Sequence, residues 1–311
     1  MDEVLFLQDL GIDRELVERR FSEILPSCTL IWNNEEVCPP TLGSLEYLVT
    51  ASVEVPGPVI AKSSLKFISI ADSDYDNVDL SSARENQVAV ANAPGYSARS
   101  VAELTVLLAM SLLRRLKTAD YLVREVRWEE YQPGTELGEK SVGIIGTGRN
   151  GIAAARLFAC FGCRLWGFSR TEREDFTSLG GRYVDLDTLL VNSDIVSLHL
   201  PLNAETAGFI DYAELGKMKQ SAVFINTARG GLVNQKALAR ALENGSISGA
   251  GLDSYTVEPP PLGQRILYSP HTLLTPHVGS QTREALLRRM ETALENIAAF
   301  REGRLLNRID V

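Results

Sequence analysis

Hydrophobic and polar residues alternate in short blocks along the first part of the chain. Apolar runs of strand length, separated by amphipathic or turn-forming segments, occupy residues 4–7, 29–32, 47–51 and 65–71. Such runs, alternating with helical segments, are typical of parallel strands joined by crossover helices. The first part of the chain is therefore predicted to form a parallel α/β sheet.

This pattern breaks at residues 92–95, a turn-forming Asn-Ala-Pro-Gly cluster, where we place a domain boundary. Ser100 and Glu103 then have the spacing of a capping box and predict the start of a long helix. Residues 104–113 are apolar on almost every face of that helix, more than one core-facing stripe requires. We expect this helix to be buried between domains or between subunits.

The alternation of strands and helices restarts after Gly138, with strands expected at 141–146, 164–168, 195–200, 222–226 and 249–253. A final helix with one apolar stripe is expected from Leu286, Met290, Ala293, Ile297 and Phe300. Because the second domain is complete before it, this helix should cross back to the first. The expected domains are 1–92 with 284–311, and 93–283.

A glycine-rich segment follows the expected strand at 141–146. Gly146, Gly148 and Gly151 form the pattern G-x-G-x-x-G between an apolar strand and a helix, the context that dinucleotide binding requires. The glycines permit a tight turn, backbone contact with a pyrophosphate and close helix packing. The loop is predicted to bind the cofactor, with Thr147, Arg149 and Asn150 as its other members.

The end of the next strand carries the residues that should meet the adenine ribose. Ser169, Arg170 and Thr171 stand there, about 20 residues beyond the glycines, in place of a carboxylate. An acidic residue would repel a 2′-phosphate, whereas hydroxyls beside an arginine would bind one. The sequence therefore predicts NADP(H) as cofactor; a solvated arginine beside a site that prefers NAD is the alternative.

Composition narrows the class of protein. The 311 residues are 45% hydrophobic and 23% charged, with 31 Lys and Arg against 40 Asp and Glu, a net charge of −9 that disfavours nucleic acid as a partner. No apolar run approaches the ~18 residues of a membrane span. Four cysteines suit a reducing compartment, so we expect a cytoplasmic protein. Cys160 and Cys163 are interpreted as small buried apolar residues, and no metal site is expected.

Only three histidines are present, and they differ in setting. His277 follows a strand end within Thr-Pro-His-Val-Gly, and strand ends of open α/β sheets are where ligands bind. His199 lies inside an apolar run and is interpreted as structural, while His271 is expected at the surface. His277 is therefore the candidate for chemistry.

These segments together resemble the D-isomer-specific 2-hydroxyacid dehydrogenases, which include glyoxylate/hydroxypyruvate reductases and phosphoglycerate dehydrogenases. The resemblance spans about residues 65–305 and is carried by the glycine fingerprint, residues 225–231 (Ile-Asn-Thr-Ala-Arg-Gly-Gly), Gly251-Leu252-Asp253 with Glu258-Pro259, and Thr275-Pro276-His277. It implies two Rossmann-like or flavodoxin-like α/β domains with parallel sheets and an active-site cleft between them. It also implies a homodimer joined through helix 100–118.

Carried over to this chain, the resemblance implies that Arg229 binds the substrate, that His277 is the acid/base and that Glu258 hydrogen-bonds His277. A guanidinium matches a carboxylate with a planar fork, and a carboxylate beside an imidazole favours its protonated form. Asp253 is implied to lie near the nicotinamide carboxamide, although a residue that ends a strand and caps a turn is an equal interpretation. Thr227, in the same motif as Arg229, is counted with the cofactor site.

Two segments depart from the family pattern. The loop at residues 71–76, which is glycine-rich in the family, contains Asp72 and Asp74, whose charges would repel an anionic substrate; Ser73 and Asp74 are still the expected substrate contacts there. Residues 50–52 are Thr-Ala-Ser, without the arginines that bind a substrate phosphate in phosphoglycerate dehydrogenases. Glu258, in turn, stands where a formate dehydrogenase would have Gln.

The sequence thus predicts an NADPH-dependent reductase of a small 2-oxo acid, of the glyoxylate or hydroxypyruvate type, which yields the D-2-hydroxy acid. Two alternatives stay open: a reductase of a bulkier 2-oxo acid, and a nucleotide-sensing corepressor of the same fold that binds peptides.

Overall fold

The computed structural model describes residues 2–35 and 37–310, which form two compact units. One unit contains Met1–Ser97 and Thr282–Val311, and the other contains Ala98–Gln281. The sequence places these boundaries at 92/93 and 283/284. The expected fold class, α/β with two parallel sheets, is confirmed.

The first unit is built on a five-stranded sheet in the order β2-β1-β3-β4-β5, with every neighbouring pair parallel. This is the strand order of flavodoxin-like folds. The strands are β1 (Asp2–Phe6), β2 (Cys28–Trp32), β3 (Tyr47–Thr50), β4 (Phe67–Ile70) and β5 (Ala89–Ala91). The helices are α1 (Arg14–Ile24), α2 (Gly57–Ala61), α3 (Leu80–Glu85) and α11 (Arg283–Arg301).

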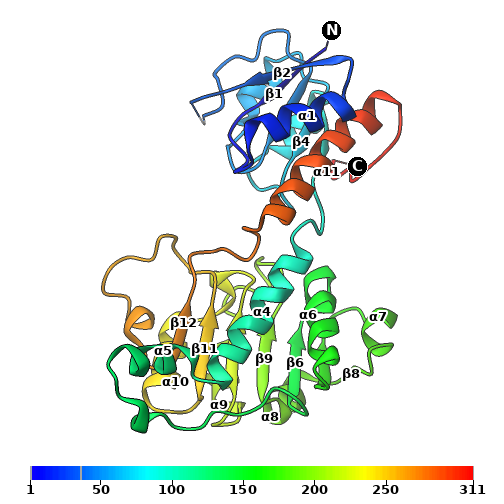
Figure 1. Ribbon diagram of the computed structural model, residues 1–311. Helices are drawn as coiled ribbons and strands as arrows, with labels where there is room; N and C mark the ends of the chain where they lie inside the picture. The colour runs from blue at the N-terminus through cyan, green and yellow to red at the C-terminus, as the bar shows by residue number, and fades with distance from the viewer. Residues whose placement is uncertain (1, 36, 311) are drawn as a thin grey trace. The chain divides into compact units, whose positions relative to one another are not determined.

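Helix α11 returns from the C-terminal end of the chain to cover this sheet beside α1 (Figure 1). Met290, Ala293 and Ile297 are fully buried in one cluster with residues of β1, β3 and β4. The Ser69 hydroxyl on β4 donates a hydrogen bond to the Ala293 carbonyl at 2.9 Å. The apolar stripe of α11 therefore completes the core of the first unit.

The second unit is built on a seven-stranded parallel sheet in the order β12-β11-β10-β9-β6-β7-β8. The chain order reverses beside β6, and ligands of open α/β sheets bind at such a switch point. The strands are β6 (Ser141–Ile145), β7 (Arg164–Phe168), β8 (Arg182–Tyr183), β9 (Ile195–Leu198), β10 (Val223–Asn226), β11 (Gly249–Leu252) and β12 (Thr272–Leu274).

The second unit contains α-helices, which Figure 1 labels, and short 3-10 helices. The α-helices are α4 (Ala98–Leu113), α5 (Leu116–Arg124), α6 (Arg149–Cys160), α7 (Glu174–Thr177), α8 (Leu186–Asn192), α9 (Tyr212–Lys217) and α10 (Gln235–Glu243). Short 3-10 helices occupy Trp128–Glu130, Gly230–Leu232 and Arg265–Tyr268. Among the described residues, none of the helices is both long and apolar enough to cross a membrane.

The structure corrects two expectations for the region after the domain boundary. Helix α4 begins at Ala98, so Ser100 lies within its first turn, and its hydroxyl donates to the Gly279 carbonyl at 2.5 Å instead of capping the helix. The expected helix 100–118 is not continuous, because Arg115 adopts a left-handed conformation (φ 51°) between α4 and α5. Sequence periodicity does not detect this break, since apolar residues continue on both sides of it.

The interpretation of both cysteines of the C-x-x-C pair as buried is wrong for Cys160. Cys160 is exposed because it lies off the stripe of α6 that Ala154, Ala155 and Phe158 bury. Cys163 is half-buried, its thiol lies 3.3 Å from the Leu137 carbonyl, and burial raises its pKa to about 11. No group of three metal-ligating side chains occurs among the described residues.

Candidate active site

The glycine-rich loop joins β6 to α6 at the switch point of the second sheet. Gly146 has a positive φ of 95°, and a Cβ there would lie 2.6 Å from the His199 carbonyl oxygen. A Cβ at Gly151 would lie 1.9 Å from the Gly146 carbonyl oxygen. These two glycines are required by the fold itself.

Gly148 differs from its neighbours because a Cβ there would meet nothing within 4 Å. Gly148 is the N-cap of the twelve-residue helix α6, and it is exposed together with Arg149, while Asn150 is half-buried. A helix N-terminus with open space in front of it suits a pyrophosphate. The loop therefore fits a dinucleotide.

A hydrogen-bond network fixes the segment beside this loop. The Tyr183 hydroxyl donates to Thr147 Oγ1 at 2.8 Å and accepts the Arg173 backbone N–H at 2.9 Å. Thr147 is buried, so its hydroxyl serves this network. The segment after β7 is thereby tied to the glycine-rich loop.

The residues expected at the ribose lie at the start of that segment. Ser169 is half-buried and Thr171 is exposed. Arg170 Nη1 lies 3.1 Å from Glu205 Oε2, in an ion pair whose side chains are 84% and 74% exposed. No carboxylate occupies residues 169–171 themselves.

Arg229 lies in a loop that Asn226 shapes. Asn226, at the end of β10 and almost fully buried, accepts the Ala228 N–H at 3.0 Å and donates to the Arg229 carbonyl at 2.9 Å. Arg229 Nη1 donates to the Ala228 carbonyl at 2.8 Å. Thr227 is buried, with its hydroxyl 2.8 Å from that of Thr105 on α4.

Gly230 brings the Arg229 loop against the loop that follows β11. A Cβ on Gly230 would lie 2.0 Å from the Tyr255 carbonyl carbon and 2.5 Å from the Thr256 nitrogen. Only glycine permits this approach. The backbone beside Arg229 therefore packs directly on the segment that leads to Glu258.

Glu258 and His277 form a pair at hydrogen-bond distance. Glu258 Oε2 lies 2.7 Å from His277 Nδ1, and Glu258 Oε1 accepts the Tyr255 N–H at 2.8 Å. The side chains of His277 and Glu258 remain 42% and 37% exposed. Both oxygens of the carboxylate are thus engaged, while Nε2 of His277 makes no hydrogen bond to any residue that the structure describes.

The His277 loop is held in place from β11. Asp253, only 1% exposed, accepts hydrogen bonds from the Thr275 hydroxyl at 2.6 Å, the Val278 N–H at 2.8 Å and the Gly279 N–H at 2.7 Å. The Tyr255 hydroxyl donates to the Thr275 carbonyl at 3.0 Å, and burial raises the pKa of Tyr255 to about 12. This anchoring supports the left-handed backbone of His277 (φ 55°).

The other two histidines lie in different surroundings. His199 is buried, with Nε2 2.9 Å from Ser197 Oγ, and burial lowers its pKa to about 4. Its Nδ1 has no hydrogen-bond partner among the described residues. His271 is exposed.

In the first unit, the loop after β4 satisfies part of its own backbone. Asp72 Oδ1 accepts the Ser73 N–H at 2.6 Å and the Asp74 N–H at 3.4 Å, and Asp72 Oδ2 accepts the Tyr96 hydroxyl at 3.3 Å. The amides of Ser73 and Asp74, which are expected to face a substrate carboxylate, therefore already face a carboxylate of the chain.

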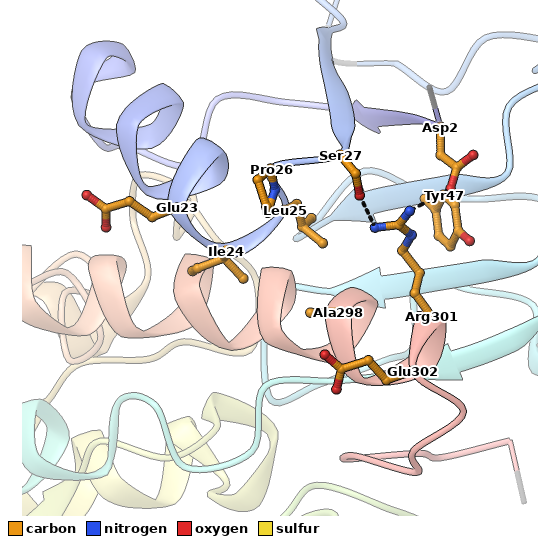
Figure 2. A pocket seen from close by; sticks show the side chains of 10 residues that line it. All are labelled: Asp2, Glu23, Ile24, Leu25, Pro26, Ser27, Tyr47, Ala298, Arg301 and Glu302. Carbon is orange, nitrogen blue, oxygen red and sulfur yellow. Dashed lines mark hydrogen bonds and ion pairs between the residues drawn. The ribbon is translucent and has the colours of Figure 1, made fainter.

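A cavity of the first unit lies away from this loop. About 650 Å³ opens where β1, β2 and β3 begin, and Figure 2 shows Arg301 reaching toward Ser27 and Asp2 there, at 2.9 and 3.0 Å. The Asp72 loop follows the opposite ends of the strands. This cavity is therefore not part of the candidate site.

The residues that surround His277 match a known family. The family model for the D-isomer specific 2-hydroxyacid dehydrogenase NAD binding domain matches residues 106–279. The chain belongs to this dehydrogenase family. The expected resemblance is confirmed, and the second unit contains the nicotinamide dinucleotide-binding domain of this family.

Several members of the family are similar to this dehydrogenase over most of its length. The glyoxylate reductase of Korarchaeum cryptofilum is 36% identical, over 94% of this chain and 93% of that protein. The hydroxypyruvate reductase of Thermotoga maritima is 37% identical, over 76% of this chain and 78% of that protein. The solved structure of a D-lactate dehydrogenase from Treponema pallidum matches with a TM-score of 0.87 and 25% identity, covering all of both chains.

The sequence alone does not indicate three contacts that shape the dehydrogenase site. Asn226 directs the Arg229 backbone, the Tyr255 N–H holds Glu258, and Ser100 holds the Gly279 carbonyl. Asn226 carries a detectable signal, because Asn commonly folds the backbone that follows a strand through its own side chain. The Tyr255–Glu258 contact lies within one turn of three residues, whereas the Ser100–Gly279 contact joins segments far apart in sequence.

Proposed function

We propose that this chain reduces a small 2-oxo acid of the glyoxylate or hydroxypyruvate type to the D-2-hydroxy acid with NADPH. The observation that carries the proposal is the His277–Glu258 pair, with the Arg229 loop packed on the segment leading to Glu258. The names of the two curated relatives support the substrate class.

In this proposal His277 is the acid that protonates the product oxygen. Glu258 engages Nδ1, so Nε2 is the nitrogen that donates its proton to the developing alkoxide. The cofactor, when bound, supplies the hydride to carbon 2 of the oxo acid. Glu258, fixed by the Tyr255 N–H, keeps the imidazole in one orientation throughout.

Arg229 is proposed to bind the substrate through its carboxylate and its reacting carbonyl. A guanidinium presents parallel donors that fix the plane of a 2-oxo acid, and polarising the carbonyl eases hydride arrival. The Asn226 hydrogen bonds preset the backbone that carries Arg229. Ser73 and Asp74 remain the proposed contacts from the first unit.

The cofactor is proposed to lie along the glycine-rich loop, with its pyrophosphate at Gly148, Arg149 and Asn150. Ser169, Arg170 and Thr171 would hold the 2′-phosphate, since no carboxylate in that segment repels it. Thr147 and Thr227 are buried and would shape the site from behind. Asp253 would act near the nicotinamide through the loop that it anchors.

A homodimer is proposed through α4 and the region that follows it. Apolar side chains that are more than half exposed gather there: Leu107, Leu116, Tyr121, Val123, Val126 and Trp128. Exposed apolar groups of this number favour an interface between copies of the chain. Light scattering of the native chain and of Leu107→Glu tests the dimer, which the variant should weaken.

A cytoplasmic location stays a prediction from the cysteine count.

The function is tested by following NADPH oxidation with glyoxylate, hydroxypyruvate, its 3-phosphate and bulkier 2-oxo acids. Glyoxylate or hydroxypyruvate should give the highest kcat/KM, and NADPH should exceed NADH. The 3-phosphate should bring no gain, since residues 50–52 contain no cation. A bulkier preferred substrate would contradict the substrate class, and peptide binding without turnover of any oxo acid would favour the corepressor alternative.

A further inference from the structure

We propose that Glu205 is a specificity-determining residue that competes with the 2′-phosphate of NADP(H) for Arg170. Its carboxylate takes the place, from a different loop, of the acidic residue that the end of β7 lacks. The effect is to narrow the advantage of NADP(H) over NAD(H). This inference rests on the cofactor site of the proposed function.

The position of the pair follows from the sheet. Arg170 follows β7, and Glu205 lies in the loop after β9. Both strands pair with β6, whose end carries the glycine-rich loop. The ion pair therefore bridges two loops on either side of that loop, at the edge of the sheet where the cofactor is proposed to bind.

The backbone around Glu205 is fixed by a local turn. Asn203 Oδ1 accepts the N–H groups of Glu205 at 2.9 Å and Thr206 at 3.1 Å. Thr206 Oγ1 donates to the Pro201 carbonyl at 2.6 Å. The loop is also joined to the Arg229 loop, because the Gly208 N–H donates to the Gly231 carbonyl at 2.8 Å. The Glu205 carboxylate can leave Arg170 by side-chain rotation, but its backbone stays nearby.

NADP(H) and NAD(H) differ in the group that they would present to this ion pair. A 2′-phosphate needs the guanidinium donors that the carboxylate already holds, and two anions beside one cation repel each other. A ribose 2′-hydroxyl carries no charge and can donate a hydrogen bond to a carboxylate. Glu205 should therefore oppose NADP(H) and leave NAD(H) nearly unaffected.

The segment that carries Arg170 contains further charges at Glu172, Arg173, Glu174 and Asp175. Within the ranges that the structure describes, Glu205 is the one carboxylate at ion-pair distance from Arg170. Glu172→Gln, which removes a neighbouring negative charge without touching the pair, is therefore a matched control.

The experiment measures dissociation constants of NADP⁺ and NAD⁺ by calorimetry, which needs no turnover. The variants are Glu205→Gln, Glu172→Gln, Arg170→Ala and the double variant Glu205→Gln/Arg170→Ala. Glu205→Gln should tighten NADP⁺ binding by about two- to fivefold, the range of an exposed charge pair, and change NAD⁺ binding less than twofold. Glu172→Gln should change both by less than twofold, and raising the salt concentration should shrink the gain.

The double variant decides whether Glu205 acts through Arg170. In the Arg170→Ala background the gain from Glu205→Gln should shrink to what direct repulsion between the carboxylate and the phosphate contributes. A Glu205→Gln variant that binds NADP⁺ no better, or gains equally without Arg170, would overturn the inference. A native chain that prefers NAD⁺ would contradict the proposed NADPH preference alone, because the shift caused by Glu205→Gln would still be measured. If neither nucleotide binds, both this inference and the proposed function are overturned.

Discussion

Asp253 accepts the backbone N–H of Gly279 at 2.7 Å, which joins the end of β11 to the loop that follows β12. The same carboxylate takes the Val278 N–H and the Thr275 hydroxyl, so three donors from the segment around His277 converge on one buried group. Ser100 closes the arrangement by donating to the Gly279 carbonyl. The acid/base candidate His277 thus lies in a loop whose backbone is held by hydrogen bonds to Asp253 and Ser100.

Replacing Asp253 with Asn should therefore loosen the loop that carries His277. An amide nitrogen cannot accept a hydrogen bond, so at least one buried N–H is left unpaired, at a cost of about 1–3 kcal/mol. We expect kcat to fall by roughly tenfold or more and the melting temperature to drop. Thr275→Val, which removes one donor and leaves the carboxylate, should have a smaller effect on both. An Asp253→Asn variant with native kcat would contradict the anchoring role.

Glu258→Gln should lower kcat for oxo acid reduction, by less than the loss of His277 itself. The variant keeps the shape of the side chain but removes the carboxylate 2.7 Å from His277 Nδ1. An amide can present either its N–H or its carbonyl oxygen to Nδ1, so it no longer fixes which imidazole nitrogen holds the proton. His277→Ala is the reference and should lose roughly two to four orders of magnitude in kcat while binding cofactor. A Glu258→Gln variant with native kcat would refute the functional pairing.

Arg229→Lys should impair both substrate binding and turnover. Lysine keeps the charge but loses the planar fork that holds carboxylate and carbonyl together. We expect KM for the 2-oxo acid to rise and kcat to fall, because the reacting carbonyl is no longer aligned. Steady-state kinetics provide the measurement, with Arg240→Lys on α10 as a control of the same exchange outside the site. A rise in KM with native kcat would limit Arg229 to uniform binding.

His199 should make the folded chain less stable in acid. Burial lowers its pKa from 6.5 to about 4, so between these values the unfolded chain binds a proton that the folded chain does not. The stabilising contribution is complete above pH 6.5 and is lost as the pH falls toward 4, by at most roughly 3 kcal/mol.

The measurement is the melting temperature of the native chain and of His199→Asn between pH 7 and pH 4.5. The variant should show a shallower decline, whereas His271→Asn, which replaces an exposed imidazole, should follow the native curve. A decline in His199→Asn as steep as in the native chain would assign the acid sensitivity to other groups.

Local patterns in the sequence determined the class of fold and much of the candidate site. Apolar runs of strand length specify buried parallel strands because both faces of such a sheet are covered, so no polar alternation is needed. The glycines at 146 and 151 indicate a tight turn from the sequence itself, and the structure leaves no room for a Cβ at either position. Strands as short as β5 and β8 give no such signal, because two or three residues carry no periodicity.

Contacts between distant segments were decided only by the tertiary structure. Nothing local indicates that Asp253 would receive its donors from residues 275–279, or that Ser100 would bond Gly279 rather than cap its own helix. The Arg170–Glu205 pair likewise joins loops 35 residues apart. Parallel sheets bring such loops into contact because they align the ends of strands that are remote in sequence. The sequence therefore determines the chemistry of each side chain. Which residue becomes its hydrogen-bond partner depends on which strand ends the sheet places side by side.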